Sequence, residues 1–149
     1  MAQIEKPQKV KLIISLISKK DYIDPAIRAL KRRFGSLDFQ SDIFEFKHTD
    51  YYFKEMGRPL YKKFISFKKL ISPAHLWKIK LYTNNLEQKF LKDNKRQVNI
   101  DPGYLALSKL VLASAKNFSH RIYLNGGIYI YNIYNYYIFN KVKLCFMCI

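Results

Sequence analysis

The sequence predicts an α+β domain in which two helices cover one face of a mostly antiparallel sheet. Three observations support this fold class: an apolar, β-branched run at residues 10–17, amphipathic helical segments near residues 25–34 and 73–92, and alternating strand-like runs between and after them. The elements follow each other as β-α-β-β-α-β and then a meander of strands. This order is that of the ferredoxin-like βαββαβ arrangement, here with a C-terminal β meander.

The first strand and the first helix have clear signals. Residues 10–17 are almost continuously apolar, which is typical of a strand that is buried on both faces. The helix that follows is expected to begin with Asp24 as its N-cap and Pro25 in its first turn. Its apolar positions recur on one face and are Ile27, Leu30 and Phe34.

Two strand-like runs and a loop separate the two helices. Residues 37–43 alternate between apolar and polar side chains, and the alternation changes phase at Phe44, which indicates a bulge. Residues 48–59 are typical of a loop, and residues 63–67 predict a third strand.

The second helix has the same kind of start, at Ser72 and Pro73. Its stripe has spacings of three and four residues and consists of Leu76, Ile79, Thr83, Leu86 and Phe90. A short strand at residues 97–101 is expected to end in a type II turn over residues 101–104, because Pro and Gly occupy the turn centre. The remaining elements are strands at residues 109–114 and 121–124 and a hairpin turn at Asn125-Gly126.

Length and charge limit the classes of function. A chain of 149 residues with 49% hydrophobic residues fits one domain with a sizeable core. The formal net charge of +16 predicts attraction to an anion such as a nucleic acid or a phosphorylated ligand. The alternative interpretation is a compositional bias toward Lys, Ile, Asn and Tyr, as AT-rich coding sequence produces.

No targeting, membrane or metal signal stands out. The first residues lack the shape of a signal peptide, and the uncharged stretch at 122–140 carries Gly, Asn and Tyr that indicate strands rather than a membrane span. Cys145 and Cys148 have CxxC spacing, but zinc would need two further ligands, so we expect no metal site. A cytoplasmic location follows from the cysteine usage. The patterns identify no cofactor and specify no oligomeric state.

Six motifs resemble a known family. They are P-x-K-L, slightly stretched, at 7–12, T-D-Y-Y-F-K-E-M-G at 49–57, K-x-x-T-N-x-x-E at 80–87, R-x-V-N-x-D-P-G-Y at 96–104, K-L-V-L-A-S at 109–114 and H-R-I-Y-L-x-x-G-I-Y at 120–129. On these motifs the chain resembles a bacterial family catalogued as domain of unknown function 4416. The resemblance implies no established activity. Some members carry an automatic GTP-binding label, but this chain has no GxxxxGK[ST] phosphate loop.

The resemblance covers about the first 129 residues, which predicts a single α+β domain at 1–129 and an atypical tail at 130–149. The family continues with an acidic strand and a T-Y-P-D-Y motif, whereas this chain has no Asp or Glu after Asp101. A frameshift or a decayed gene end is the simplest explanation, and part of the net charge would then follow from lost acidic residues.

The clearest candidate site is on the second helix. Lys80, Thr83, Asn84 and Glu87 have the spacing i, i+3, i+4 and i+7, so they share one face. This face would form the wall of a polar pocket, with Glu87 as an acid, a base or a metal ligand. The alternative is a core Thr bonded to a preceding carbonyl, with Lys80 and Glu87 in solvent.

Other candidates lie on the strands that follow. Asn99 and Asp101 share one face of their strand, unless Asp101 only anchors its turn, and Arg96 faces the other way or precedes the strand. His120 could transfer a proton, or it could be an ordinary surface histidine. The remaining candidate ligand-binding residues are Lys116 and Arg121, which form a basic cluster with His120, and Tyr52 and Glu55, which with Tyr51 would form a lid or a stacking platform or simply pack over the sheet edge.

Three classes of function fit these residues. The first and favoured one is a module that binds a nucleotide or a nucleic acid. The second is a small enzyme for a phosphorylated or nucleotide substrate, with Glu87, Asp101 and His120 as catalytic residues. The third is an interaction protein without a small ligand. We expect Asn84, Glu87, Asn99 and His120 to reach one small ligand, which would favour the second class.

Overall fold

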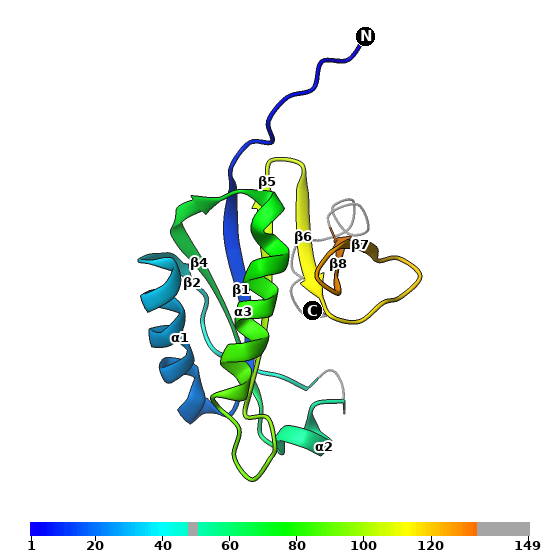
Figure 1. Cartoon of the computed structure of the whole chain (residues 1–149). Helices are drawn as coiled ribbons and strands as arrows, with labels where there is room; N and C mark the ends of the chain where they lie inside the picture. Colours follow the sequence, from blue (N-terminus) through cyan, green and yellow to red (C-terminus); the bar gives the residue numbers. More distant parts are fainter. Residues whose placement is uncertain (48–50, 134–149) are drawn as a thin grey trace.

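The described residues, 1–47 and 51–133, form an eight-stranded antiparallel sheet with three α-helices in a computed structural model (Figure 1). The predicted α+β class with a mostly antiparallel sheet is confirmed. The strands are β1 (Val10–Ser18), β2 (Leu37–Gln40), β3 (Phe44–Glu45), β4 (Tyr61–Ile71), β5 (Val98–Ala106), β6 (Lys109–Ser114), β7 (Ile122–Asn125) and β8 (Ile128–Asn132). The helices are α1 (Lys20–Phe34), α2 (Phe53–Met56) and α3 (Leu76–Gln88), and a 3-10 turn, η1 (Pro73–His75), leads into α3.

The strand order is β2-β4-β1-β5-β6-β8-β7, and β3 also pairs with β4. Neighbouring strands pair in antiparallel fashion. The sheet therefore has more strands than the four of a ferredoxin-like sheet, because β6, β8 and β7 extend it beyond β5. The hairpin of β7 and β8 turns at Gly126 and Gly127, whose φ values of +58° and +75° suit a two-residue turn; the predicted hairpin is present, but its turn lies one residue after the predicted Asn125-Gly126.

Helices α1 and α3 lie side by side on one face of the sheet, as Figure 1 shows. Leu12, Ile14 and Leu16 of β1 are fully buried against Ile23 and Leu30 of α1 and against apolar residues of α3. The alternate residues of β1 point to the opposite face, where Ile17 packs against residues around α2. Burial on both faces explains the nearly continuous apolar run of β1.

Helix α1 starts at Lys20, so the predicted start at Asp24 and Pro25 is wrong. Pro25 lies inside the helix and removes one hydrogen bond, the one from residue 25 to the carbonyl of Asp21. The extra first turn places Ile23 in the core with only 1% of its surface exposed. Burial of an apolar side chain therefore favours the earlier start over the local Asp-Pro signal.

Residues 101–104 continue β5, so the predicted turn is also wrong. The N–H group of Ile100 points away from β1, and because N–H groups alternate along a strand, the nitrogen of Pro102 points the same way. Pairing with β6 begins only at Gly103, so Pro102 costs no hydrogen bond to either neighbouring strand. A Cβ atom on Gly103 would lie 2.5 Å from the carbonyl oxygen of Val111, so glycine is required for close approach of β6.

The predicted boundary at residues 129 and 130 falls inside β8, whose residues 129–132 pair with β6. The rest of the predicted tail, from residue 134, lies outside the described residues. Among the described helices, none has both the length and the apolar character needed to cross a membrane.

Candidate ligand-binding cavity

A cavity of about 680 Å³ opens where β5 and β6 diverge. Helix α3, the free part of β5, the region after β6 and the segment around α2 form its walls. Nine of the predicted site residues line it: Tyr52, Lys80, Asn84, Glu87, Arg96, Asn99, Asp101, Lys116 and Arg121. Residues that are far apart in the sequence therefore meet in one cavity.

The free edge of β5 explains why α3 contributes polar side chains here. Where β6 no longer pairs, the Ile100 N–H donates to Oε1 of Glu87 at 2.6 Å, and the Ile100 carbonyl accepts from Nζ of Lys80 at 3.1 Å. Lys80 and Glu87 are two turns apart on one face of α3, so together they replace the missing strand neighbour of Ile100. Both side chains are thus buried and structural, in contrast to the alternative that they are solvated.

A network of charged and amide groups covers this wall of the cavity. Nζ of Lys80 pairs with Oδ1 of Asp101 at 2.9 Å, and the amide of Asn99 donates to the other oxygen of Asp101. Arg96 joins three segments, because its guanidinium donates to Asn99 at 2.9 Å, to Glu87 at 3.3 Å and to Glu55 at 2.8 Å. Glu55 therefore stands at the rim, bonded to Arg96, although it does not line the cavity. The cations of this wall are all neutralised by carboxylates.

The pKa values of the buried Glu87 and the partly buried Asp101 are shifted in opposite directions. Burial raises the pKa of Glu87, and the charge of Lys80 and the Ile100 N–H offset the effect only in part. Burial also acts against the charged form of Asp101, but the charge and hydrogen bond of Lys80 outweigh it and hold the pKa below its ordinary value. A nearby pair of carboxyl groups with divergent pKa values is typical of an acid and base pair.

The opposite wall carries cations that no carboxylate of the described residues neutralises. Nη1 of Arg121 donates to Oγ of Ser114 at 2.8 Å and to the Lys116 carbonyl at 2.7 Å, and its guanidinium lies 5.0 Å from the ring centre of Tyr131. Nζ of Lys116 bonds the hydroxyl of Tyr51 and lies 4.0 Å from that ring centre. This wall thus combines positive charge with aromatic rings.

Three predicted site residues do not line the cavity: Glu55 at its rim, Thr83 and His120. Thr83 is fully buried, and its hydroxyl donates to the Lys80 carbonyl at 3.0 Å, which matches the structural alternative for this residue. His120 is exposed, and its ring lies edge-on to Phe118 and Tyr131, each 5.4 Å away between ring centres. Of the four residues expected around one ligand, Asn84, Glu87 and Asn99 line the same cavity, whereas His120 contacts Tyr131 but does not line it.

Sequence reasoning missed several lining residues. They are Phe46, Gln88, Ala113, Ser114, Ala115 and Tyr131. One signal could have found Ser114: Leu110, Leu112 and Ser114 alternate on one face of β6, so a polar residue ends an apolar stripe. Tyr131 looked like ordinary strand composition, and only the pairing of β8 with β6 places it beside the cavity.

The opposite pKa shifts predict opposite pH dependences for two variants. The folded state holds the proton of Glu87 more tightly than the unfolded state, so the stability of wild type relative to Glu87→Gln should fall as the pH rises from about 4.3, the ordinary carboxyl value, through the raised pKa. For Asp101→Asn the wild-type advantage should be present at neutral pH and be lost as the pH falls through the lowered pKa. Urea unfolding of both variants over a pH series measures these slopes, and slopes of the same sign would contradict the assignment.

Metal binding has no support in the described part of the chain, where no group of three or more His, Cys, Asp or Glu side chains is placed to hold an ion. Cys145 and Cys148 lie outside the described residues.

Fold and cavity together define an α+β protein with an extended antiparallel sheet and a polar cavity at the point where the sheet splits. The chain belongs to the domain of unknown function 4416 family, whose sequence model matches residues 8–145. The match continues beyond residue 129, where the quoted motifs end. No curated protein and no solved structure matches the chain.

Proposed function

We propose that the cavity binds a nucleotide or a similar phosphorylated ligand with a flat ring. The observation that carries this proposal is the basic, aromatic wall: Lys116 and Arg121 have no carboxylate partner among the described residues and lie beside Tyr51 and Tyr131. Phosphate oxygens would neutralise the two cations, and a base would pack against the tyrosine rings.

Size and polarity of the cavity agree with a ligand of this class. Its volume of about 680 Å³ lies within the range of roughly 300–1,000 Å³ that is usual for small-molecule sites. The side-chain amides of Asn84 and Gln88 line it and make no hydrogen bond within the described residues, so they are free to bind a sugar hydroxyl or a base edge.

A ligand panel with matched variants tests this proposal. We expect at least one of ATP, GTP, CTP, UTP or the corresponding monophosphates to bind in calorimetric titrations and to raise the melting temperature. Lys116→Gln/Arg121→Gln should weaken binding about 10-fold to 100-fold, because hydrogen bonds to charged groups contribute about 1.5–3 kcal/mol.

The matched control is Lys92→Gln/Lys95→Gln, which removes the same charge from exposed positions after α3 and should leave the affinity within about twofold of wild type. Equal weakening by both pairs would assign the binding to overall charge. If no nucleotide in the panel binds, the proposal is wrong, and the class of interaction protein without a small ligand is then favoured.

A second candidate function is catalysis on the bound ligand. The opposite pKa directions of Glu87 and Asp101 favour it, because the two neighbouring carboxyl groups differ in how tightly each holds a proton. Product analysis after incubation with each ligand that binds would detect turnover. Glu87→Gln should then keep binding and lose turnover, since the Gln oxygen can still accept from the Ile100 N–H.

For the fold itself we propose that β1, α1, β2, β4, α3 and β5 form a ferredoxin-like half. The adjacency β2-β4-β1-β5 and the two helices on one face support this classification. The strands β6 to β8 would then be an extension that supplies the basic wall of the cavity.

A further inference from the structure

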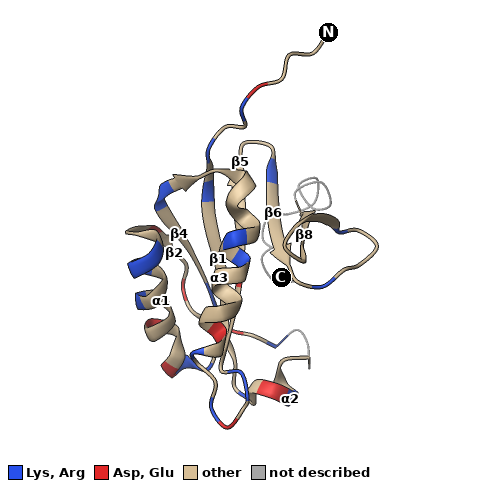
Figure 2. Cartoon of the chain, in the orientation of Figure 1, with Lys and Arg blue, Asp and Glu red and all other residues tan. Residues whose placement is uncertain are grey.

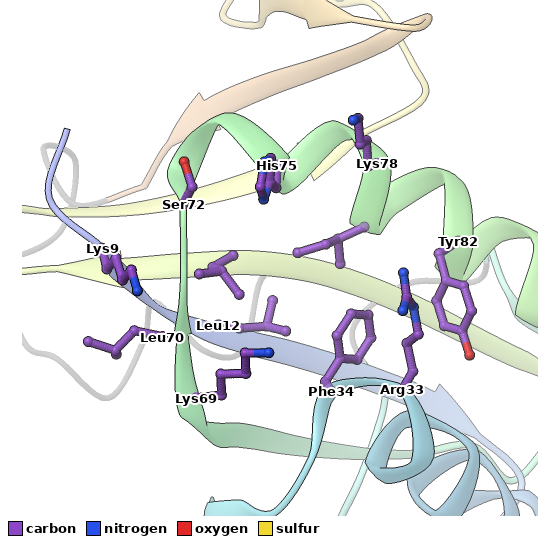
Figure 3. A pocket seen from close by; sticks show the side chains of 12 residues that line it. Lys9, Leu12, Arg33, Phe34, Lys69, Leu70, Ser72, His75, Lys78 and Tyr82 are labelled. Carbon is purple, nitrogen blue, oxygen red and sulfur yellow. The ribbon is translucent and has the colours of Figure 1, made fainter. Parts of the chain in front are cut away.

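A second cavity of about 470 Å³ lies between the end of α1, the end of β4 and the start of α3 (Figure 3). It shares α3 with the first cavity but none of its lining residues. We call it the helix groove and define it by Lys9, Arg33, Lys69, Lys78, Phe34 and Tyr82. Its charge and its floor differ from those of the first cavity.

The rim of the helix groove is positively charged without compensation. Lys9 precedes β1, Arg33 ends α1, Lys69 lies in β4 and Lys78 lies in α3, so four segments each contribute one exposed cation. Among the described residues, no Asp or Glu lines the groove. In the first cavity, by contrast, carboxylates neutralise half of the cations. The charge therefore favours an anionic occupant.

The floor of the helix groove is apolar and aromatic. Leu12 and Ile79 form its buried base, and Phe34 meets Tyr82 edge to face with 5.5 Å between ring centres. The guanidinium of Arg33 lies 5.4 Å from the ring centre of Tyr82. Figure 3 shows the side chains of Arg33, Phe34 and Tyr82 close together, with Leu12 and Lys69 on the other side of Phe34. An occupant should thus have flat or apolar groups between its charges.

Basic residues also continue outside the groove. Lys31 and Arg32 precede Arg33 on α1, and Lys68 precedes Lys69 on β4, and all three are exposed. Figure 2 shows this concentration of Lys and Arg on the end of α1 and on the adjoining end of β4. These exposed cations continue along α1 and β4 beyond the groove, where a chain of phosphates could follow them further than a single phosphate could.

We propose that the helix groove binds a single strand of nucleic acid. Its phosphates contact the four rim cations, and its bases pack against the floor. A duplex presents stacked and paired bases that cannot reach such a floor, so the single strand is the favoured form. This site is separate from the first cavity and does not depend on whether that cavity binds a free nucleotide.

Fluorescence anisotropy of a labelled short oligothymidylate over a salt series tests the proposal. We expect binding at low salt and a linear fall of the logarithm of the affinity with the logarithm of the salt concentration. Arg33→Gln/Lys69→Gln should weaken binding by about tenfold or more at low salt. It should also make the salt slope shallower by about 1.4, because each single-strand phosphate contact contributes about 0.7.

Two variants with the same loss of charge serve as controls. Lys92→Gln/Lys95→Gln should keep the wild-type slope, and Lys116→Gln/Arg121→Gln should change it less than Arg33→Gln/Lys69→Gln does, which separates this proposal from the first cavity. No binding at low salt, equal effects of all three pairs, or equal affinity for a duplex of the same length would each overturn the proposal. Binding of dodecyl phosphate but not of oligothymidylate would overturn it as well, since the groove would then serve an amphiphile.

Discussion

Lys80→Met is expected to lower the free energy of unfolding by about 3–5 kcal/mol, the usual result of removing one partner from a buried ion pair. Only 6% of the Lys80 side chain and 22% of the Asp101 side chain are exposed, so water in the cavity can replace only part of the lost contact. The Ile100 carbonyl also loses its donor at the free edge of β5. Urea unfolding followed by circular dichroism measures the loss.

A double variant and a neighbouring lysine test the cause. Lys80→Met/Asp101→Asn should recover at least about 1.5 kcal/mol relative to Lys80→Met, because the second change removes the stranded charge. Lys78→Met, an exposed position on the same helix, should change stability by less than about 0.5 kcal/mol. If Lys80→Met were as stable as Lys78→Met, the pair would contribute nothing to holding α3 on β5.

Gly103→Val should lower the free energy of unfolding by about 3 kcal/mol, at the upper end of typical overpacking. A Cβ atom there would lie 2.5 Å from both the Val111 carbonyl oxygen and a methyl group of Leu112. Differential scanning calorimetry would record the effect as a lower melting temperature.

The backbone part of this clash can be separated from the side-chain part. Gly103→Val/Leu112→Ala removes the methyl contact but leaves the Val111 carbonyl in place, so it should remain at least as unstable as Gly103→Val. Recovery of stability in the double variant would show that only the leucine side chain opposes a larger residue at this position.

Those lining residues of the cavity that share one helix or one strand could be predicted from their spacing in the sequence. The face of Lys80, Asn84 and Glu87 follows from 3.6 residues per turn, and the common face of Asn99 and Asp101 follows from strand alternation. Both patterns depend only on local geometry, so both were predicted. His120 was predicted from its residue type alone, and no local pattern states whether it would line the cavity.

Local turn signals failed where tertiary packing opposed them. Asp101-Pro102-Gly103 has the composition of a turn, yet pairing with β1 along its whole length and with β6 from Gly103 onward holds it in an extended strand. Asp24-Pro25 resembles a helix start, yet the buried Ile23 extends α1 by one turn. In both places long-range contacts stabilise a conformation that the local sequence disfavours.

By itself the sequence determined the fold class, the two long helices, the Asn-Gly hairpin signal and the polar face of α3, because each depends on periodicity or on the conformational preference of a few adjacent residues; the short helix α2, by contrast, lies within residues predicted as a loop. Only the tertiary structure decided that pairing between β5 and β6 stops at the Gly103–Leu112 pair. It also decided that Lys80 and Glu87 bind the backbone of Ile100, which β6 leaves unpaired. It also decided that Lys116 and Arg121 face that wall across a cavity. Such positions depend on which strands pair and where pairing stops, and strand pairing is set by contacts between residues that are distant in the chain.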